Sequence, residues 1–225
     1  MKSEKEIHDF LEEIKNICIK SNRDPSQITI IGASKRQTAD SIGRAISCGV
    51  INFGENFLQE AEPKIRRLSS APTWHFIGSI QSKKAKKIAS LFQWVHTVDR
   101  IRVAEKLNKY RIKSQGKLDI CVQINTDNEK NKSGIKIEET KSFINELKVF
   151  NMLRIRGLMT IPKPNKNLNN QRKGFKRIFN FFKELKETHP FLDTLSMGMS
   201  DDYEAAIMEG ANMIRIGTKL FGPRK

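Results

Sequence analysis

Apolar positions along the chain follow two periods, which alternate from one end to the other. Short segments rich in Ile, Val, Phe and Leu predict buried strands, and longer segments with apolar residues every three or four positions predict amphipathic helices. The predicted strands cover residues 27–33, 50–53, 73–77, 94–98, 118–125, 153–160, 193–197 and 212–216. The predicted helices cover residues 3–20, 38–48, 56–69, 82–91, 100–111, 138–148, 170–187 and 201–209.

This alternation predicts an α/β protein. Because a strand–helix–strand unit requires parallel pairing, eight such units in 225 residues fit a single closed (β/α)8 barrel, a TIM barrel. An open doubly wound sheet is the alternative, which the absence of a GxGxxG segment after the first strand disfavours. We expect residues 1–225 to form one domain, with no second domain after the barrel and with residues 163–173 as a mobile loop at its top.

The composition indicates a globular, cytoplasmic protein. Hydrophobic residues make up 38% of the chain, and no apolar run is long enough to cross a membrane. The first residues alternate charges with an apolar stripe and lack the apolar block of a secretory signal. Three widely spaced cysteines, Cys18, Cys48 and Cys121, lie among apolar residues and predict buried thiols rather than disulfides or a metal site.

The net charge of +16 leaves two interpretations open. A strongly basic chain attracts polyanions, which favours nucleic acid as a partner. The basic residues are, however, scattered through the predicted helices, which favours a general bias toward lysine and makes nucleic acid an unexpected partner. We interpret the segment with Lys83, Lys84, Lys86 and Lys87 in the same way, as a solvated face that could guide an anionic ligand.

Glycines and hydroxyls follow the last two predicted strands, at the end of a (β/α)8 barrel where chemistry takes place. The turns SMGMSDD (196–202) and RIGT (215–218) could offer backbone N–H groups and hydroxyls to an anion. Ser200 could cap the next helix and also donate to an oxyanion, whereas Asp201 and Asp202 are expected to point away. These residues fit a phosphate-binding cup and two ordinary tight turns equally well.

The first predicted strand, ITIIGA, is followed by Ser34 and Lys35. Most lysines at strand ends extend to solvent. In a barrel mouth, apolar walls and a nearby Arg215 would leave part of the Lys35 amine uncharged, and a neutral amine attacks an aldehyde to form a Schiff base. With a phosphate cup, such an amine suits pyridoxal 5′-phosphate (PLP). An aldolase-type reaction on a sugar phosphate needs much the same parts, so the residues leave both chemistries open.

Two polar residues on the predicted strands have structural and functional interpretations. His75, between Trp74 and Phe76, could face the cofactor, but a hydrogen-bonded core histidine is the favoured interpretation. Glu55 could contact neighbours in the barrel rather than a ligand. No cluster of metal ligands occurs in the sequence.

Eight segments occur in a fixed order: ASK, FGENFLQE, WHFIGSIQSKK, VHTVDR, VQINTDNEKNKSG, RIRGLMTIP, LSMGMSDDYEAAIMEG and MIRIGTKLFGPR. Together, from about residue 28 to residue 224, they resemble the YggS/PROSC family of pyridoxal phosphate homeostasis proteins. The chain departs from the family at Lys83, where an asparagine is common, and at Arg36 and Gln37, which replace a more usual Thr-Lys. The resemblance implies a barrel like the N-terminal domain of bacterial alanine racemase.

The resemblance also implies a cofactor site without catalytic residues or a metal. It implies that Lys35 holds PLP as a Schiff base, that Asn56 lies beside the cofactor, and that Arg215 lies near the pyridine nitrogen. Within the two turns, the resemblance implies cofactor or phosphate contacts by Ser196, Gly198, Met199, Ser200, Gly217 and Thr218.

These residues favour a binding protein over an enzyme. A cation such as Arg215 beside the pyridine nitrogen would oppose its protonation and weaken the stabilisation of carbanions. Neither Tyr110 nor Tyr203 ends a predicted strand, so no opposing base is evident. The resemblance implies a PLP carrier in vitamin B6 homeostasis, and we expect a monomer with PLP-dependent apo-enzymes as partners. A weak PLP-dependent amino-acid racemase is the alternative.

Overall fold

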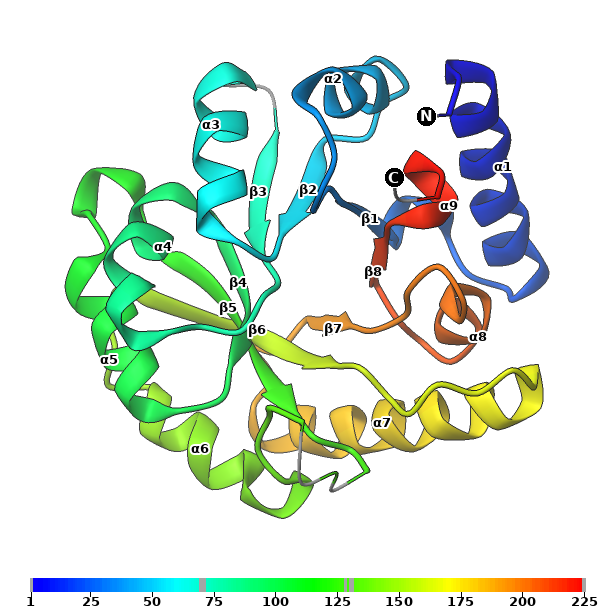
Figure 1. The fold of residues 1–225 in the computed structure, drawn as a ribbon. Coiled ribbons are helices and arrows are strands. Elements are labelled where there is room, and N and C mark those ends of the chain that lie inside the picture. Colours follow the sequence, from blue (N-terminus) through cyan, green and yellow to red (C-terminus); the bar gives the residue numbers. More distant parts are fainter. Residues whose placement is uncertain (1, 69–71, 128, 130–131, 224–225) are drawn as a thin grey trace.

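Eight parallel strands close into a barrel, and helices surround its outside (Figure 1). The computed structural model describes residues 2–68, 72–127, 129 and 132–223. Strands that are consecutive in the sequence are neighbours in the sheet, and the last strand pairs with the first. The predicted closed (β/α)8 barrel is therefore confirmed, and the alternative of an open sheet is wrong.

The strands follow the predicted order with small shifts. They are β1 (Thr29–Ala33), β2 (Asn52–Glu55), β3 (Thr73–Phe76), β4 (Trp94–Val98), β5 (Leu118–Ile124), β6 (Leu153–Thr160), β7 (Thr194–Ser196) and β8 (Met213–Ile216). β4 and β6 have the predicted limits, whereas β2 starts later than predicted and extends to Glu55. A buried carboxylate can end this strand because Lys64 pairs with it, and the local apolar pattern does not show that partner.

The helices also follow the predicted order. They are α1 (Glu4–Lys20), α2 (Ala39–Ser47), α3 (Leu58–Leu68), α4 (Ala85–Leu91), α5 (Ile101–Tyr110), α6 (Thr140–Leu147), α7 (Leu168–Thr188), α8 (Tyr203–Met208) and α9 (Thr218–Phe221). Short 3-10 turns precede α4 at Ser82–Lys84 and α6 at Ile137–Glu139, and two more lie at Pro25–Gln27 and Lys113–Gln115.

The predicted starts of α4 and α6 fall in the 3-10 turns that precede them, and two other helices depart from the prediction in a different way. α7 begins at Leu168, inside the segment 163–173 that was predicted as a loop, because the Asn167 side chain accepts the backbone N–H of Asn170 at 3.1 Å and caps the helix. α9 was not predicted, since its four residues are too few to show a helical period.

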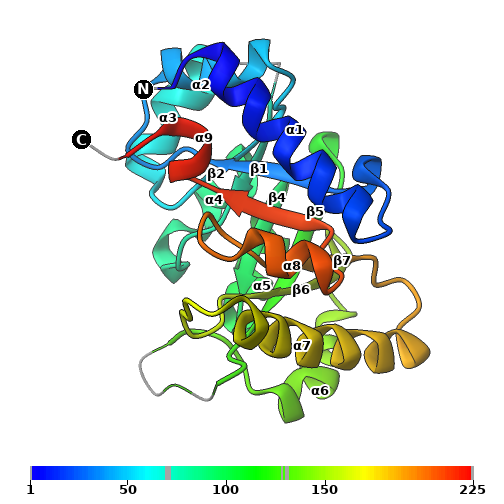
Figure 2. The ribbon, with the colours of Figure 1, turned by 90° about the vertical axis from the view of Figure 1, so that its right-hand side faces the viewer.

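Helix α1 precedes the first strand and packs beside α2, α8 and α9 (Figures 1 and 2). Ser3 and Glu6 form a capping box at its start, and Ile7, Phe10 and Ile14 bury its apolar face. The Tyr203 hydroxyl of α8 donates to Glu13 of α1. The first helix thus covers the side of the barrel near β8, where the chain closes on itself.

Apolar residues form two layers. Inside the barrel, Ile31, Trp94, Cys121, Met159 and Met213 pack together, and a larger cluster lies between the strands and the helices. All three cysteines are buried and free, as predicted. Among the described helices, none has the length and apolar character needed to cross a membrane.

Candidate functional site

The residues assigned to a cofactor lie at the carboxyl ends of four neighbouring strands. Lys35 follows β1, Asn56 follows β2, and the other seven lie at the ends of β7 and β8 or just after them. In the barrel β7 pairs with β8, β8 with β1 and β1 with β2. The fold therefore gathers all nine residues along one part of the barrel's mouth.

Two turns that follow β7 and β8 are bonded to each other. Gly198 has a φ of +96°, and a Cβ there would lie 2.6 Å from the Cβ of Ala206, so glycine is required. Ser200 Oγ accepts the backbone N–H groups of Gly217 and Lys219 at 3.2 and 3.4 Å. Ser200 therefore caps α9, not α8 as its position in the sequence suggested.

The carboxylate of Asp202 lies inside the first of these turns, which corrects the expectation that it points away. Its Oδ1 accepts the backbone N–H of Met199 at 2.6 Å. Burial raises the pKa of Asp202, and both this hydrogen bond and the nearby Arg215 oppose the rise. Asp202 thus shapes the turn and balances part of the charge of Arg215, while Asp201 is exposed.

Arg215 is a buried cation held in a fixed position. Its Nη1 donates to Ser196 Oγ at 2.8 Å, and its Nη2 donates to the carbonyl of Thr160, the last residue of β6, at 2.9 Å. Burial lowers the pKa of Arg215 to about 10, and the attraction of Asp202 opposes the fall. The guanidinium therefore remains charged at neutral pH, with N–H donors left over for a ligand.

His75 is a hydrogen-bonded core residue, as the sequence favoured. The ring is fully buried, and its nitrogens lie 2.9 Å from His96 Nε2 and 3.0 Å from Asn52 Oδ1. Burial lowers the pKa of His75 to about 3, so the imidazole is neutral. Because both nitrogens are occupied inside the barrel, His75 is not free to contact a cofactor directly.

Lys35 lies in a tight turn between β1 and α2. The Ser34 N–H donates to the carbonyl of Gly54 on β2, and Arg36 has a φ of +61° with its N–H bonded to Glu60 Oε2 at 2.7 Å. Lys35 is half-buried. The turn is thus fixed on both sides of Lys35, by β2 and by α3.

Behind this turn, Glu55 and Lys64 form a buried ion pair. Lys64 Nζ lies 2.8 Å from Glu55 Oε1 and donates to the carbonyl of Ser34 at 2.8 Å, while Ser34 Oγ donates to the same carboxylate oxygen at 2.7 Å. Burial raises the pKa of Glu55, and the charge and hydrogen bond of Lys64 oppose the rise. Glu55 therefore contacts barrel neighbours, which was one of its two interpretations.

We expect the substitution Lys64→Met to lower the free energy of unfolding by about 3 kcal/mol, because it leaves the Glu55 carboxylate buried without its cation. Chemical denaturation at neutral pH measures this. Lys87→Met is the matched control, since Lys87 forms an ion pair of the same 2.8 Å length with Glu62 at the surface. A loss for Lys64→Met no larger than that of the control would contradict a structural role for the buried pair.

Asn56 follows β2 and lies next to the carboxyl end of β3. Its Oδ1 is buried and has no hydrogen-bond partner among the described residues. A Cβ at Gly78, just after β3, would lie 2.2 Å from the Asn56 carbonyl oxygen, so the glycine allows the two strand ends to approach. A hollow of about 290 Å³ opens here, lined in part by Asn56, Gly78 and Lys84.

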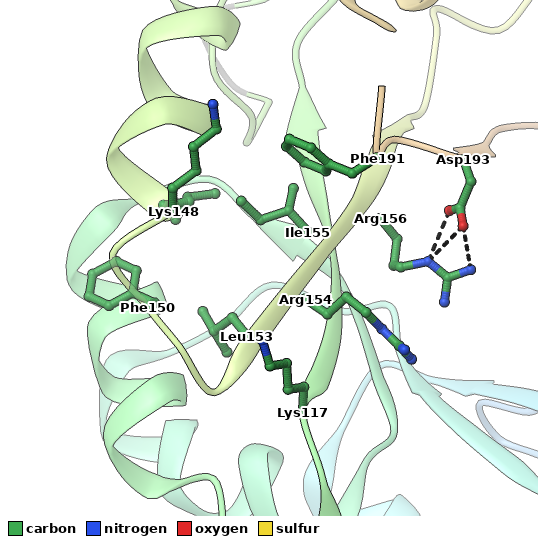
Figure 3. A pocket seen from close by; sticks show the side chains of 10 residues that line it. Lys117, Lys148, Phe150, Leu153, Arg154, Ile155, Arg156, Phe191 and Asp193 are labelled. Carbon is green, nitrogen blue, oxygen red and sulfur yellow. Dashed lines mark hydrogen bonds and ion pairs between the residues drawn. The ribbon is translucent and has the colours of Figure 1, made fainter. Parts of the chain in front are cut away.

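Another hollow lies at the opposite end of the barrel, where β5, β6 and β7 begin (Figure 3). Its walls are apolar and cationic and include Lys117, Lys148, Phe150, Leu153 and Phe191. Arg154 and Arg156 both pair with Asp119. Arg156 also lies 2.7 Å from Asp193 (Figure 3). Because these arginines already have carboxylate partners, we assign them the structural role of joining three strands.

Sequence reasoning missed three residues of the site: His96, Thr160 and Lys64. His96 and Thr160 contact the Ser196–Arg215 pair, and Lys64 supports the Lys35 turn. His96 carried a weak signal, since a polar ring in the apolar segment WVHTV requires a buried partner. The other two carried no local signal, because a backbone carbonyl and a helical lysine are ordinary features. Among the described residues, no group of three or more His, Cys, Asp or Glu could hold a metal ion.

The sequence of this chain matches a family model and the sequences of known proteins. The family model "Alanine racemase, N-terminal domain" matches residues 33–225. A pyridoxal phosphate homeostasis protein of Pseudomonas aeruginosa is 44% identical over 205 residues, which cover 91% of this chain and 88% of that protein. One from Escherichia coli K12 is 40% identical over 217 residues, which cover 95% and 93% of the two chains.

Solved structures show the same barrel. PipY of Synechococcus elongatus PCC7942, solved with PLP bound, has a TM-score of 0.84 and 32% identity, with 96% of this chain and 100% of PipY covered. Alanine racemase of Clostridium difficile 630 has a TM-score of 0.74 at 18% identity, with 97% of this chain and 57% of the racemase covered. The racemase is similar in fold alone.

Proposed function

The chain belongs to the pyridoxal phosphate homeostasis proteins, and we propose that it binds PLP at the carboxyl end of its barrel and takes part in vitamin B6 homeostasis. The observation that carries this proposal is the meeting of Lys35, two glycine turns and a buried Arg215 at four adjoining strand ends. A PLP-bound structure of PipY, 32% identical over most of the chain, supports it.

The groups at these strand ends fit the parts of PLP. The two turns after β7 and β8 offer a glycine in the left-handed region and the exposed Thr218, whose hydroxyl has no hydrogen bond to any described residue. Arg215 offers N–H donors to a ring nitrogen that lacks a proton. The buried Asn56 Oδ1, orphaned within the described part of the chain, is a group that a ligand or water would satisfy.

When bound, PLP supplies an aldehyde that can bond covalently to a lysine amine. We assign that amine to Lys35, because its turn is held by β2 and α3 at the rim of the barrel. Gly198, Met199, Ser200, Gly217 and Thr218 would surround the phosphate. The Ser196 hydroxyl already contacts His96 and Arg215, so we assign to it the positioning of Arg215; its phosphate contact stays a prediction.

The arrangement supports holding PLP rather than turning over amino acids. Arg215 would keep the pyridine nitrogen unprotonated, because two adjacent cations repel, and an unprotonated ring is a weak electron sink. Tyr203 is bonded to Glu13 of α1, and Tyr110 is the last residue of α5, so neither is offered to the mouth as a base. We therefore propose a non-catalytic carrier, with PLP-dependent apo-enzymes as recipients.

The test is to mix the full chain with PLP, record the absorbance, reduce with borohydride and map the modified peptide. We expect a yellow species and a single modified site at Lys35. Because the chain is rich in lysine, the same reaction on urea-unfolded protein is the control, and there the label should spread over many lysines. A colourless mixture, or a folded protein labelled as diffusely as the unfolded one, would refute the proposal. Measuring the chirality of added amino acids with the loaded protein separates a carrier from a weak racemase.

A further inference from the structure

Five polar side chains form a continuous hydrogen-bonded series through the interior of the barrel. The series runs from Asn52, at the start of β2, through His75, His96 and Ser196 to Arg215. The four distances, in that order, are 3.0, 2.9, 2.9 and 2.8 Å. Both rings and the serine are fully buried. The series therefore links the amino end of the barrel to the proposed cofactor site.

The Asn52 end of the series fixes the direction of donation, and the Arg215 end is compatible with it. Arg215 can only donate, so Ser196 Oγ accepts from it and keeps its own proton available for His96 Nδ1. At the other end Asn52 Oδ1 can only accept, so His75 carries its proton on Nε2. His75 Nδ1 must then accept the Nε2 proton of His96. No link is left with two donors or two acceptors facing each other.

We propose that this series locks His75 and His96 as neutral Nε2–H tautomers and thereby presents Ser196 Oγ as an acceptor that positions Arg215. His96 and His75 are positioning residues, since neither is placed against the cofactor. A change of tautomer at either ring would set two lone pairs or two protons against each other in a fully buried site. The orientation of Arg215 thus depends on side chains far from the barrel's mouth.

The surroundings of the two rings favour the neutral form. The His96 pKa is lowered by burial first, then by His75 and by the positive charge of Arg215. His75 is stacked on Trp94, with ring centroids 5.6 Å apart. Electrostatic attraction by Asp202 and Cys121 opposes the fall in the pKa of Arg215. Among the described groups, no carboxylate acts on either ring as a stabiliser of a second proton.

The first test is a nitrogen-15 NMR measurement on the full chain without PLP, which does not depend on the proposed function. The chain has four histidines, and the urea-unfolded chain serves as the control, in which all four rings should gain a second proton near the ordinary histidine pKa. We expect His75 and His96 of the folded chain to hold a single proton on Nε2 from about pH 8 to about pH 5.5. A proton on Nδ1 of either ring, or a second proton in this range, would overturn the lock.

The second test rests on the proposed function and uses PLP as the probe. Replacing His96→Leu removes the acceptor from Ser196, and we expect the affinity for PLP to fall by about tenfold. His96→Asn places an amide oxygen where Nδ1 was, so it should recover most of this loss although the contact with His75 is gone. Equal affinities for His96→Leu and the unchanged chain would refute the positioning of Arg215. If the unchanged chain itself fails to bind PLP, the proposed function fails, and the tautomer result still stands.

Discussion

Replacing Lys35 with alanine is expected to abolish the yellow adduct with PLP completely and to leave no borohydride-stable label at this site. The covalent bond needs an amine at one place, and the turn that holds Lys35 is fixed by Gly54 of β2 and Glu60 of α3. Contacts to the phosphate and to Arg215 remain in Lys35→Ala, so PLP should still bind. We expect its affinity to fall by at least about tenfold, or about 1.4 kcal/mol.

The matched control for this substitution is Lys84→Ala. Lys84 is half-buried and lines the hollow beside Asn56, so it is a lysine of similar exposure close to the barrel's mouth. Its replacement should leave the adduct at full yield. The assignment of Lys35 is wrong if the label persists in Lys35→Ala, or if Lys84→Ala removes it. Fluorescence titration and peptide mass mapping after reduction provide the two measurements.

Acidification is expected to destabilise the fold well before most carboxylates titrate. His75 and His96 are fully buried and neutral, with the pKa of His75 lowered to about 3 and that of His96 well below its usual value. In the unfolded chain both rings take up a proton near the ordinary histidine pKa of about 6.5. The unfolded state therefore binds more protons below that pH, so the free energy of unfolding falls as the pH falls.

The expected size of this effect is about 2 kcal/mol for each ring between about pH 7.5 and about pH 5, or about 4 kcal/mol for the pair. His189, whose pKa is lowered chiefly by burial, adds a smaller change of the same sign. Glu55 and Asp202 act against it, because burial raises their pKa and their folded forms take up protons at higher pH than the unfolded ones.

Urea denaturation at several pH values within this range measures the slope of the free energy of unfolding against pH. The variant His75→Gln removes one of the two rings and should roughly halve the contribution of the pair to the slope. Carboxylates whose pKa is lowered in the folded chain, such as Asp193, change the free energy of unfolding at more acidic pH. Their contribution is therefore separated in pH from that of the histidines. An equal change in the free energy of unfolding for His75→Gln and the unchanged chain between neutral pH and about pH 5 would contradict a buried neutral imidazole at this position.

The order of strands and helices could be predicted from the sequence because each element leaves a local signal. An apolar run such as WVHTV fits a buried strand, and β4 has the predicted limits. Lys35, Asn56 and the glycine turns could also be placed, since they follow predicted strands and a barrel puts all such ends at one mouth. The resemblance of eight ordered segments then suggested which ligand these residues would take.

The partners of the buried polar groups were decided only by the tertiary structure. Ser196 and His96 are 100 positions apart, and Lys64 meets Ser34 across 30 positions, so no local period connects them. Asp202 faces into its turn because the Met199 N–H and the charge of Arg215 are there, which a short acidic segment does not reveal. Apolar burial is local and repeats along the chain, whereas a buried polar atom requires one partner at one distance, and only the closed barrel supplies it.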